Sequence, residues 1–202
     1  MTSTTTRQRA FVFHGYGATP EDHWFGWLAE RLGAEGIPTT VPALPAPLDP
    51  RRGPWEDSVR TALGRPDEHT IVVAHSLGCL AVLRHLRSLP GPWRLRTLVL
   101  VAGFTDPLPA LPELDAFVGD GCDMSELRSH IVRPVVIRSD NDPLVPPAHT
   151  DRLAERLGAP VQVAPGAGHF LDAEGITELP VVYEAISPSS TTRRPPVGFH
   201  RP

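Results

Sequence analysis

The sequence contains no lysine, and all 19 of its basic residues are arginine. Without a lysine amine the chain cannot form a Schiff base with a carbonyl substrate or hold pyridoxal phosphate through one, so both chemistries are excluded. The formal net charge is −4, and no block of five or more basic residues occurs. Nucleic acid is therefore disfavoured as a partner.

Cysteine is also scarce, because only Cys79 and Cys122 are present. Two cysteines make no disulfide framework, and neither a Cys-x-x-Cys nor a His-x-x-x-His spacing occurs. These are the spacings that commonly announce a metal site. We therefore expect no metal and no cofactor.

Long apolar runs are missing too. None approaches the roughly 18 residues of a membrane-spanning helix, and residues 1–6 lack the charged-then-apolar plan of a secretory signal. We expect a cytoplasmic protein, a monomer or homodimer, that has no membrane partner.

The length of 202 residues suits a single domain. Residues 1–8 are rich in Thr and Ser, and residues 187–202 in Ser, Thr, Pro and Arg. Such segments have little to pack, so both ends are predicted to be disordered and residues 9–186 to form the domain.

Between these ends, apolar runs alternate with helical patterns. The predicted strands are 10–14, 39–44, 70–74, 97–102, 134–138 and 160–164, and the predicted helices are 24–32, 55–63, 76–89, 147–157 and 176–186. This alternation predicts an α/β fold: a six-stranded, parallel, doubly wound sheet with helices on both faces. In this class ligands bind at the carboxyl ends of the strands.

The segment Ala74-His75-Ser76-Leu77-Gly78 joins a predicted strand to a predicted helix. A serine flanked two residues away on each side by small residues, in this context, is typical of a nucleophile elbow. Ser76 is therefore the candidate nucleophile, and the Leu77 N–H, at a helix N-terminus, is a candidate oxyanion donor. Glycine usually stands where this chain has Ala74; a methyl group is the smallest possible addition, and the turn is expected to close.

A serine needs a base, and the base needs an orienting carboxylate. In α/β-hydrolases these follow in the order Ser, Asp or Glu, His. Asp140 and Asp142 both follow a predicted strand; we favour Asp142, because Pro143 after it fixes the turn, which makes Asp140 a turn cap. A solvated acidic loop is the alternative for this pair. The candidate base is His169, which follows the last predicted strand.

The other histidines are weaker candidates for the base. His75 adjoins the nucleophile but should point to the opposite face of its strand. Six more fall in polar or surface contexts: His23, His69, His85, His130, His149 and His200. His14 ends the first predicted strand and is expected to brace the loop that follows it.

That loop, His14-Gly15-Tyr16-Gly17, offers backbone N–H groups between glycines. If the first strand lies beside the elbow strand, the Tyr16 N–H joins that of Leu77 in an oxyanion hole. A plain glycine turn is the alternative interpretation.

With these motifs in view, residues 10–186 resemble the small α/β-hydrolases typified by retinoblastoma-binding protein nine and its bacterial relatives. The resemblance rests on 14–17 with Asp22-His23-Trp24, on 74–79, on Ser139-Asp140-Asn141-Asp142-Pro143-Leu144-Val145-Pro146, and on Gly166-Ala167-Gly168-His169-Phe170. It implies a minimal fold with sheet order 2-1-3-4-5-6, no large cap domain, and a triad of Ser76, Asp142 and His169.

We therefore expect a serine hydrolase that cleaves small esters or related acyl compounds through an acyl-enzyme. The alternatives are an acyltransferase, cyclase or lyase of the same fold, and a non-catalytic binding protein. The small-molecule acyl substrate is expected to meet apolar residues near strand ends: Tyr16, Trp24, Phe104, Leu108, Val145 and Phe170. Residues 104–130 are the candidate flap.

Overall fold

The computed structural model describes residues 7–187 of the chain. The predictions of disorder for residues 1–6 and 188–202 lie outside the described residues. Within them the chain forms a six-stranded sheet in the order β2-β1-β3-β4-β5-β6. Every neighbouring pair is parallel. The predicted fold class and sheet order are therefore confirmed.

The strands are β1 (Arg9–Phe13), β2 (Thr39–Thr40), β3 (Thr70–His75), β4 (Leu95–Val101), β5 (Ile131–Ser139) and β6 (Val161–Ala164). The helices are α1 (Phe25–Ala34), α2 (Arg52–Leu63), α3 (Leu77–Ser88), α4 (Asp115–Val118), α5 (Leu127–His130), α6 (Pro147–Leu157) and α7 (Pro180–Ile186). Short 3₁₀ turns, η1 (Pro112–Leu114) and η2 (Asp172–Glu174), precede α4 and α7. Within residues 7–187, no helix combines the length and apolarity needed to cross a membrane.

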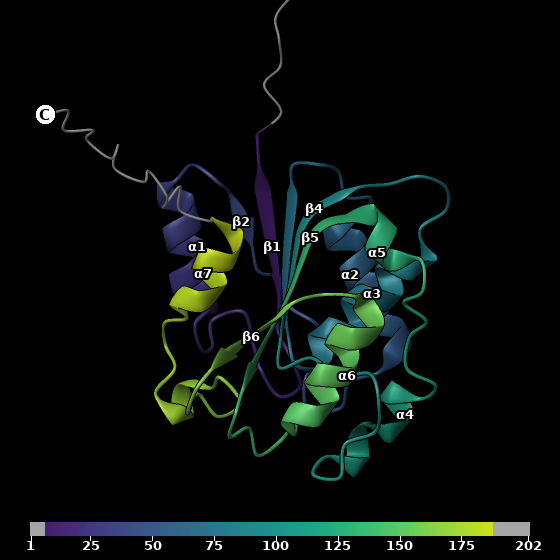
Figure 1. The fold of residues 1–202 in the computed structure, drawn as a ribbon, viewed down its shortest axis with the longest axis vertical. Coiled ribbons are helices and arrows are strands. Elements are labelled where there is room, and N and C mark those ends of the chain that lie inside the picture. Colours follow the sequence, from purple (N-terminus) through teal and green to yellow (C-terminus); the bar gives the residue numbers. More distant parts are fainter. Residues whose placement is uncertain (1–6, 188–202) are drawn as a thin grey trace, which may run out of the picture.

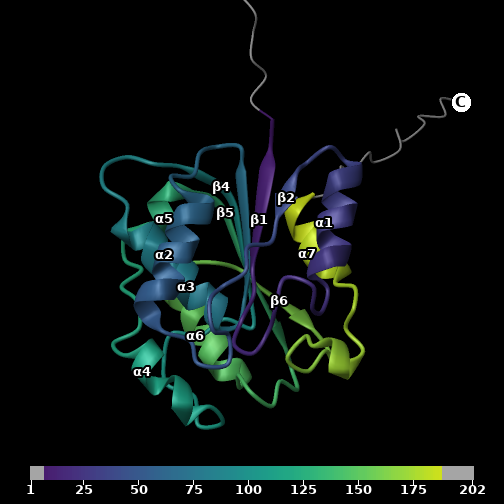
Figure 2. The same cartoon turned by 180° about the vertical axis from the view of Figure 1, so that it is seen from behind.

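The sheet is the middle of three layers. Helices α1 and α7 cover one face, and α2, α3 and α6 cover the other (Figure 1; Figure 2 shows the same layers from behind). Each face has its own apolar core, built around Trp24 and Phe25 on the α1 side and around Trp55 and Phe104 on the α3 side. All six residues of β3 are buried, because helices cover both faces of this central strand.

Most elements begin or end up to three residues from the predicted bounds, as α2 does at Arg52, and β2 and α7 differ by more. β2 has only two residues, because Pro42, Pro45 and Pro47 follow it and supply no N–H to a ladder. β5 begins at Ile131 and runs through Pro134, whose register partner is Leu98. The last helix begins at Pro180, which takes the first helical position, where its missing N–H costs nothing.

Residues 104–130, the candidate flap, bury several apolar side chains in the core. Phe104, Phe117 and their apolar neighbours lie in the core on the α3 side. Arg84 of α3 is buried beneath this segment, where its guanidinium donates to the carbonyl oxygens of Phe117, Val118 and Gly121. These carbonyls lie at and beyond the C-terminal end of α4, where a cation is favoured. In this structure the candidate flap is therefore anchored to α3.

β1 and α3 meet so closely that only glycine fits between them. A Cβ at Gly78 would lie 2.4 Å from the His14 carbonyl oxygen and 2.9 Å from that of Phe13. Both obstacles are backbone atoms, which cannot rotate away. The close approach fixes the start of α3 against the end of β1, the two places that flank the predicted site.

Two buried histidines brace loops around the sheet. His14 Nδ1 donates to the Gly15 carbonyl at 3.0 Å, and His14 Nε2 accepts from the Leu44 N–H at 2.9 Å. His85 Nε2 donates to the Gly64 carbonyl at 2.7 Å, and this residue is buried rather than in the surface context expected from sequence. Burial lowers the pKa of both imidazoles.

Replacing Gly78 by alanine should lower the free energy of unfolding by about 2 kcal/mol, because the new methyl must displace backbone. The matched control is Gly26→Ala in α1, where nothing lies within 4 Å of the added Cβ. That change should raise stability by about 0.5–1 kcal/mol through helix propensity. Urea denaturation of both variants measures the difference; equal effects would contradict the close approach.

The buried histidines predict a loss of stability in mild acid. The pKa of each imidazole is lower in the folded protein than in the unfolded chain, where it is about 6.5. At pH values between the folded and the unfolded pKa, the unfolded chain therefore binds more protons than the folded protein does. The free energy of unfolding should thus fall as pH drops below about 6.5, by up to roughly 1.4 kcal/mol per pH unit for each group. Urea melts between about pH 7.5 and pH 5 measure the slope, which His85→Leu should reduce. A flat profile would contradict this.

Candidate active site

Ser76 stands on the tight turn that leads from β3 into α3. Its backbone has φ 53° and ψ −125°, the left-handed side of the map that non-glycine residues seldom occupy. The Ser76 N–H donates to the Val101 carbonyl at 2.8 Å, which holds the turn against β4. Ala74 is fully buried in its strand and paired with Phe13 and Leu100, so its methyl group is accommodated while the elbow forms.

Three residues from distant parts of the chain form one hydrogen-bonded series beside this turn. His169 Nε2 lies 2.9 Å from Ser76 Oγ, and His169 Nδ1 lies 2.8 Å from Asp142 Oδ2. A carboxylate accepts from Nδ1–H, which leaves Nε2 to accept from the serine hydroxyl. All three side chains are buried, with residue exposures of 3% for Ser76, 4% for His169 and 8% for Asp142.

The Asp142 carboxylate is itself fixed by its own loop. Its Oδ1 accepts from the backbone N–H groups of Leu144 at 2.9 Å and Val145 at 2.8 Å, while Oδ2 faces His169. The turn that includes Pro143 thus aims the second oxygen at the imidazole. The structure brings Asp142, not Asp140, to His169.

The two residues before Asp142 bind the same neighbouring loop. Asp140 Oδ1 accepts from the Gly166 N–H at 2.7 Å, and Asn141 Oδ1 accepts from the Gly168 N–H at 2.9 Å. Three consecutive side chains after β5 therefore hold the loop after β6. Asp140 therefore binds the neighbouring loop instead of capping its own turn as predicted, and the contact of Asn141 was not predicted. The sequence signal for both contacts is the run of three side chains with acceptor oxygens at 140, 141 and 142.

Two further groups hold the backbone of His169. The Glu174 carboxylate accepts from the His169 N–H at 2.7 Å, and His75 Nε2 donates to the His169 carbonyl at 2.9 Å. Neither contact was expected from sequence. The alternation of side chains along a strand correctly predicts that His75 points to the opposite face of the sheet from Ser76. It does not predict that the loop carrying His169 passes over the face to which His75 points.

The loop after β1 passes directly beside the serine. A Cβ at Gly15 would lie 2.7 Å from Ser76 Cβ and 3.3 Å from Ser76 Oγ, so the backbone here is as close as glycine permits. The Tyr16 N–H meets no acceptor among residues 7–187. The Leu77 N–H opens α3, where helical geometry leaves the first donors unpaired. These two N–H groups are the ones expected to form an oxyanion hole.

The six residues expected to meet substrate do not gather at one place. Phe104, Leu108 and Val145 lie in the core on the α3 side, with Tyr16 packed against it. Trp24 and Phe170 lie in the core on the α1 side, across the sheet from the other four. Only Tyr16 among the six has a partly exposed side chain. Trp24 and Phe170 are thus core residues on the opposite side of the sheet from the other four.

Neither cysteine is as good a candidate nucleophile as Ser76. The Cys79 thiol is buried behind the elbow and donates to the Ala74 carbonyl at 3.2 Å. Burial raises the pKa of both cysteine thiols, so they stay protonated and unreactive. Nor does the described part of the chain bring together three metal-ligating side chains from His, Cys, Asp and Glu.

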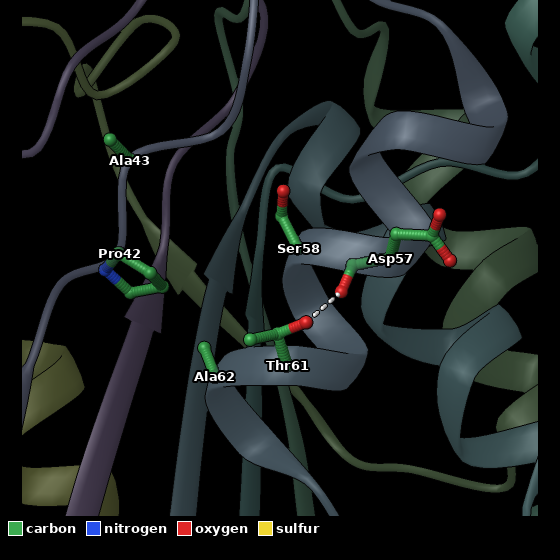
Figure 3. Close-up of a pocket in the computed structure, with 6 residues that line it drawn as sticks. All are labelled: Pro42, Ala43, Asp57, Ser58, Thr61 and Ala62. Carbon is green, nitrogen blue, oxygen red and sulfur yellow. Dashed lines mark hydrogen bonds between the residues drawn. The ribbon is translucent and has the colours of Figure 1, made fainter.

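A shallow groove of about 330 Å³ lies apart from these loops, between α2 and the segment after β2 (Figure 3). It is lined by Pro42, Ala43, Asp57, Ser58, Thr61 and Ala62. The Thr61 hydroxyl donates to the Asp57 carbonyl, and the Ser58 hydroxyl to that of Pro54. These hydroxyls are thus used within α2, and the groove presents no cluster of convergent polar groups.

Known proteins resemble this chain over most of its length. A family model described as serine hydrolase matches residues 10–187. The putative hydrolase YdeN of Bacillus subtilis (strain 168) is 37% identical over 180 residues, which cover 89% of this chain and 95% of that protein. The serine hydrolase RBBP9 of Rattus norvegicus is 26% identical over 180 residues, covering 87% and 93%.

Solved structures show the same likeness. The crystal structure of the ydeN gene product from B. subtilis superposes with a TM-score of 0.86 at 36% identity, covering 90% of this chain and 97% of that one. Est1E from Butyrivibrio proteoclasticus shares the fold, with a TM-score of 0.63 at 15% identity over 90% and 89% of the two chains. By its fold, its matched residues and its relatives, this chain belongs to the serine hydrolase family.

Proposed function

We propose that the protein hydrolyses small carboxylic esters or related acyl compounds with a Ser76–His169–Asp142 catalytic triad. Membership of the serine hydrolase family supports hydrolysis in general. The observation that carries the finer proposal is the pair of hydrogen bonds that links Ser76 Oγ to His169 Nε2 and His169 Nδ1 to Asp142 Oδ2. No metal or organic cofactor takes part in the chemistry proposed.

In the first half-reaction, Ser76 Oγ attacks the carbonyl carbon of the substrate while His169 Nε2 takes the hydroxyl proton. The tetrahedral oxyanion is held by the N–H groups of Tyr16 and Leu77, each of which contributes about 3 kcal/mol to lowering the barrier. His169 then gives its proton to the leaving alcohol oxygen, and the carbon–oxygen bond breaks. The acyl group is left as an ester on Ser76.

In the second half-reaction, His169 deprotonates a water molecule that attacks the acyl-enzyme. The intermediate collapses, the acid leaves, and Ser76 regains its proton from His169. Asp142 keeps the imidazole in the Nδ1–H tautomer throughout and stabilises its positive charge. The bonds from Leu144 and Val145 to Asp142 Oδ1 support this role, because they prevent the carboxylate from rotating.

Ser76→Ala should abolish turnover of p-nitrophenyl esters, with a loss of about three orders of magnitude or more, because the attacking oxygen is gone. A panel of ester, thioester and amide substrates, run on wild type and variant, measures this and ranks the acyl chemistry. A fluorophosphonate probe should label the wild type and not the variant. Wild-type protein that neither labels nor turns over would overturn the proposal.

The same panel separates the alternatives. Release of free acid identifies hydrolysis, whereas an acyl group delivered to an added alcohol or amine in preference to water identifies an acyltransferase. Labelling of Ser76 without turnover of any acyl compound would point to cyclase or lyase chemistry.

Asp142→Asn should lower kcat by about three to four orders of magnitude, because an amide cannot hold the imidazole in the required tautomer. Asp140→Asn is the matched control two residues away. Its amide oxygen still accepts from the Gly166 N–H, so kcat should stay close to that of wild type. Steady-state kinetics on one ester compare the two, and a larger loss in the Asp140 variant would contradict the assignment of the acid.

A further inference from the structure

His75 is the residue immediately before the proposed nucleophile, yet its side chain contacts the backbone of the proposed base, His169. Its Nε2 lies 2.9 Å from the backbone carbonyl oxygen of His169, and the two imidazole rings are 4.9 Å apart between centroids. A carbonyl oxygen can only accept, so Nε2 carries the hydrogen and Nδ1 the lone pair. The imidazole is thus defined as one tautomer.

The ring is held in a closed aromatic environment. Trp24 and Phe25 lie with ring centroids 6.0 and 5.9 Å from it, and His23 at 5.8 Å. Burial lowers the pKa of His75 well below its usual value, and the neighbouring His169 lowers it further. The imidazole therefore stays neutral and acts as a hydrogen-bond donor rather than as a charge.

A buried histidine at this position lowers the stability of the fold, whereas an apolar side chain would not. His75 Nδ1 and Trp24 Nε1 are the buried side-chain polar atoms that lack a protein partner among residues 7–187. A buried nitrogen without a partner is unfavourable, and an apolar side chain of similar size would escape that penalty. The presence of an imidazole at this position is better explained by the hydrogen bond from its Nε2–H to the His169 carbonyl.

Among residues 7–187, the His169 carbonyl oxygen accepts a hydrogen bond from His75 and from no other donor. The N–H is held by Glu174 of the 3₁₀ turn η2, and the ring by Asp142 of the loop after β5. His75 comes instead from β3, the strand that also presents Ser76. Its hydrogen bond is thus a direct tie between the strand of the nucleophile and the backbone of the base.

We propose that His75 is a positioning residue that holds the His169 backbone to β3 and thereby sets the separation between His169 Nε2 and Ser76 Oγ. This inference rests on the proposed function, because it assigns His75 a task in the same triad. His75 takes no proton from substrate; it acts through His169.

The sharpest test compares two amides at this position. In His75→Gln, the amide nitrogen can occupy the place of Nε2 and still donate to the His169 carbonyl. In His75→Asn, the nitrogen stops at the place of Nδ1 and cannot reach it. We expect His75→Asn to lower kcat by about 10- to 100-fold with little change in KM, because a displaced base spoils the attack geometry. His75→Gln should restore most of kcat.

His85→Asn is the control for a merely structural role. It removes a similar bond, from a buried histidine Nε2 to the Gly64 carbonyl at 2.7 Å, on α3 away from the triad. We expect this variant to lose stability while it keeps its kcat. Should His75→Asn fail to fold, His75→Phe keeps a ring in the aromatic environment and removes the donor in its place.

A readout independent of turnover is the proton shared by His169 Nδ1 and Asp142, a downfield NMR resonance assigned by its loss in Asp142→Asn. It should shift or broaden in His75→Asn and persist in His75→Gln and His85→Asn. An unchanged resonance and kcat in His75→Asn, or an equal loss of kcat in His85→Asn, would overturn the inference. Failure of the wild type on every acyl substrate would instead overturn the proposed function, while the resonance still decides the role of His75.

Discussion

The hydrogen bonds between the loop after β5 and the loop after β6 are the constraint on which the rest of the site depends. Asp140, Asn141 and Asp142 reach in turn to Gly166, Gly168 and His169. The loops that follow the neighbouring strands β5 and β6 are thereby joined into one unit. Without this unit the imidazole would be carried by a flexible turn, and its alignment with Ser76 would carry an entropic cost on every encounter with substrate.

The opposite wall of the site is rigid for a different reason, the close contact of backbones. Gly78 brings α3 against the end of β1, and Gly15 brings the loop after β1 against Ser76. Here no side chain adapts and no hydrogen bond is needed, because the geometry leaves room for nothing larger than a hydrogen atom. Backbone donors held in this way need no reorganisation when charge develops near them, which is the condition for electrostatic stabilisation of an oxyanion.

Much of this arrangement could be predicted from the sequence because it depends on local signals. The apolar strands, the small residues around Ser76 and the order of serine, aspartate and histidine each occupy a short stretch of chain. The missed features are contacts between stretches: His75 with the His169 carbonyl, Asn141 with Gly168, and the burial of His85. The alternation of side chains along β3 predicts the face of the sheet to which His75 points. It does not predict which loop passes over that face. The side of the sheet taken by Trp24 and Phe170 was not predictable from local signals either, since it follows from the three-layer packing.

The backbone of Ser76 has a consequence for how this protein can change. A side chain at φ 53° stores free energy, of the order of 1–3 kcal/mol, that a glycine would release. The position that would gain stability from this change is thus the one that bears the proposed nucleophile. At this one residue, stability and the proposed activity are opposed. Selection for stability alone would favour glycine at position 76, which would keep the fold and remove the proposed nucleophile.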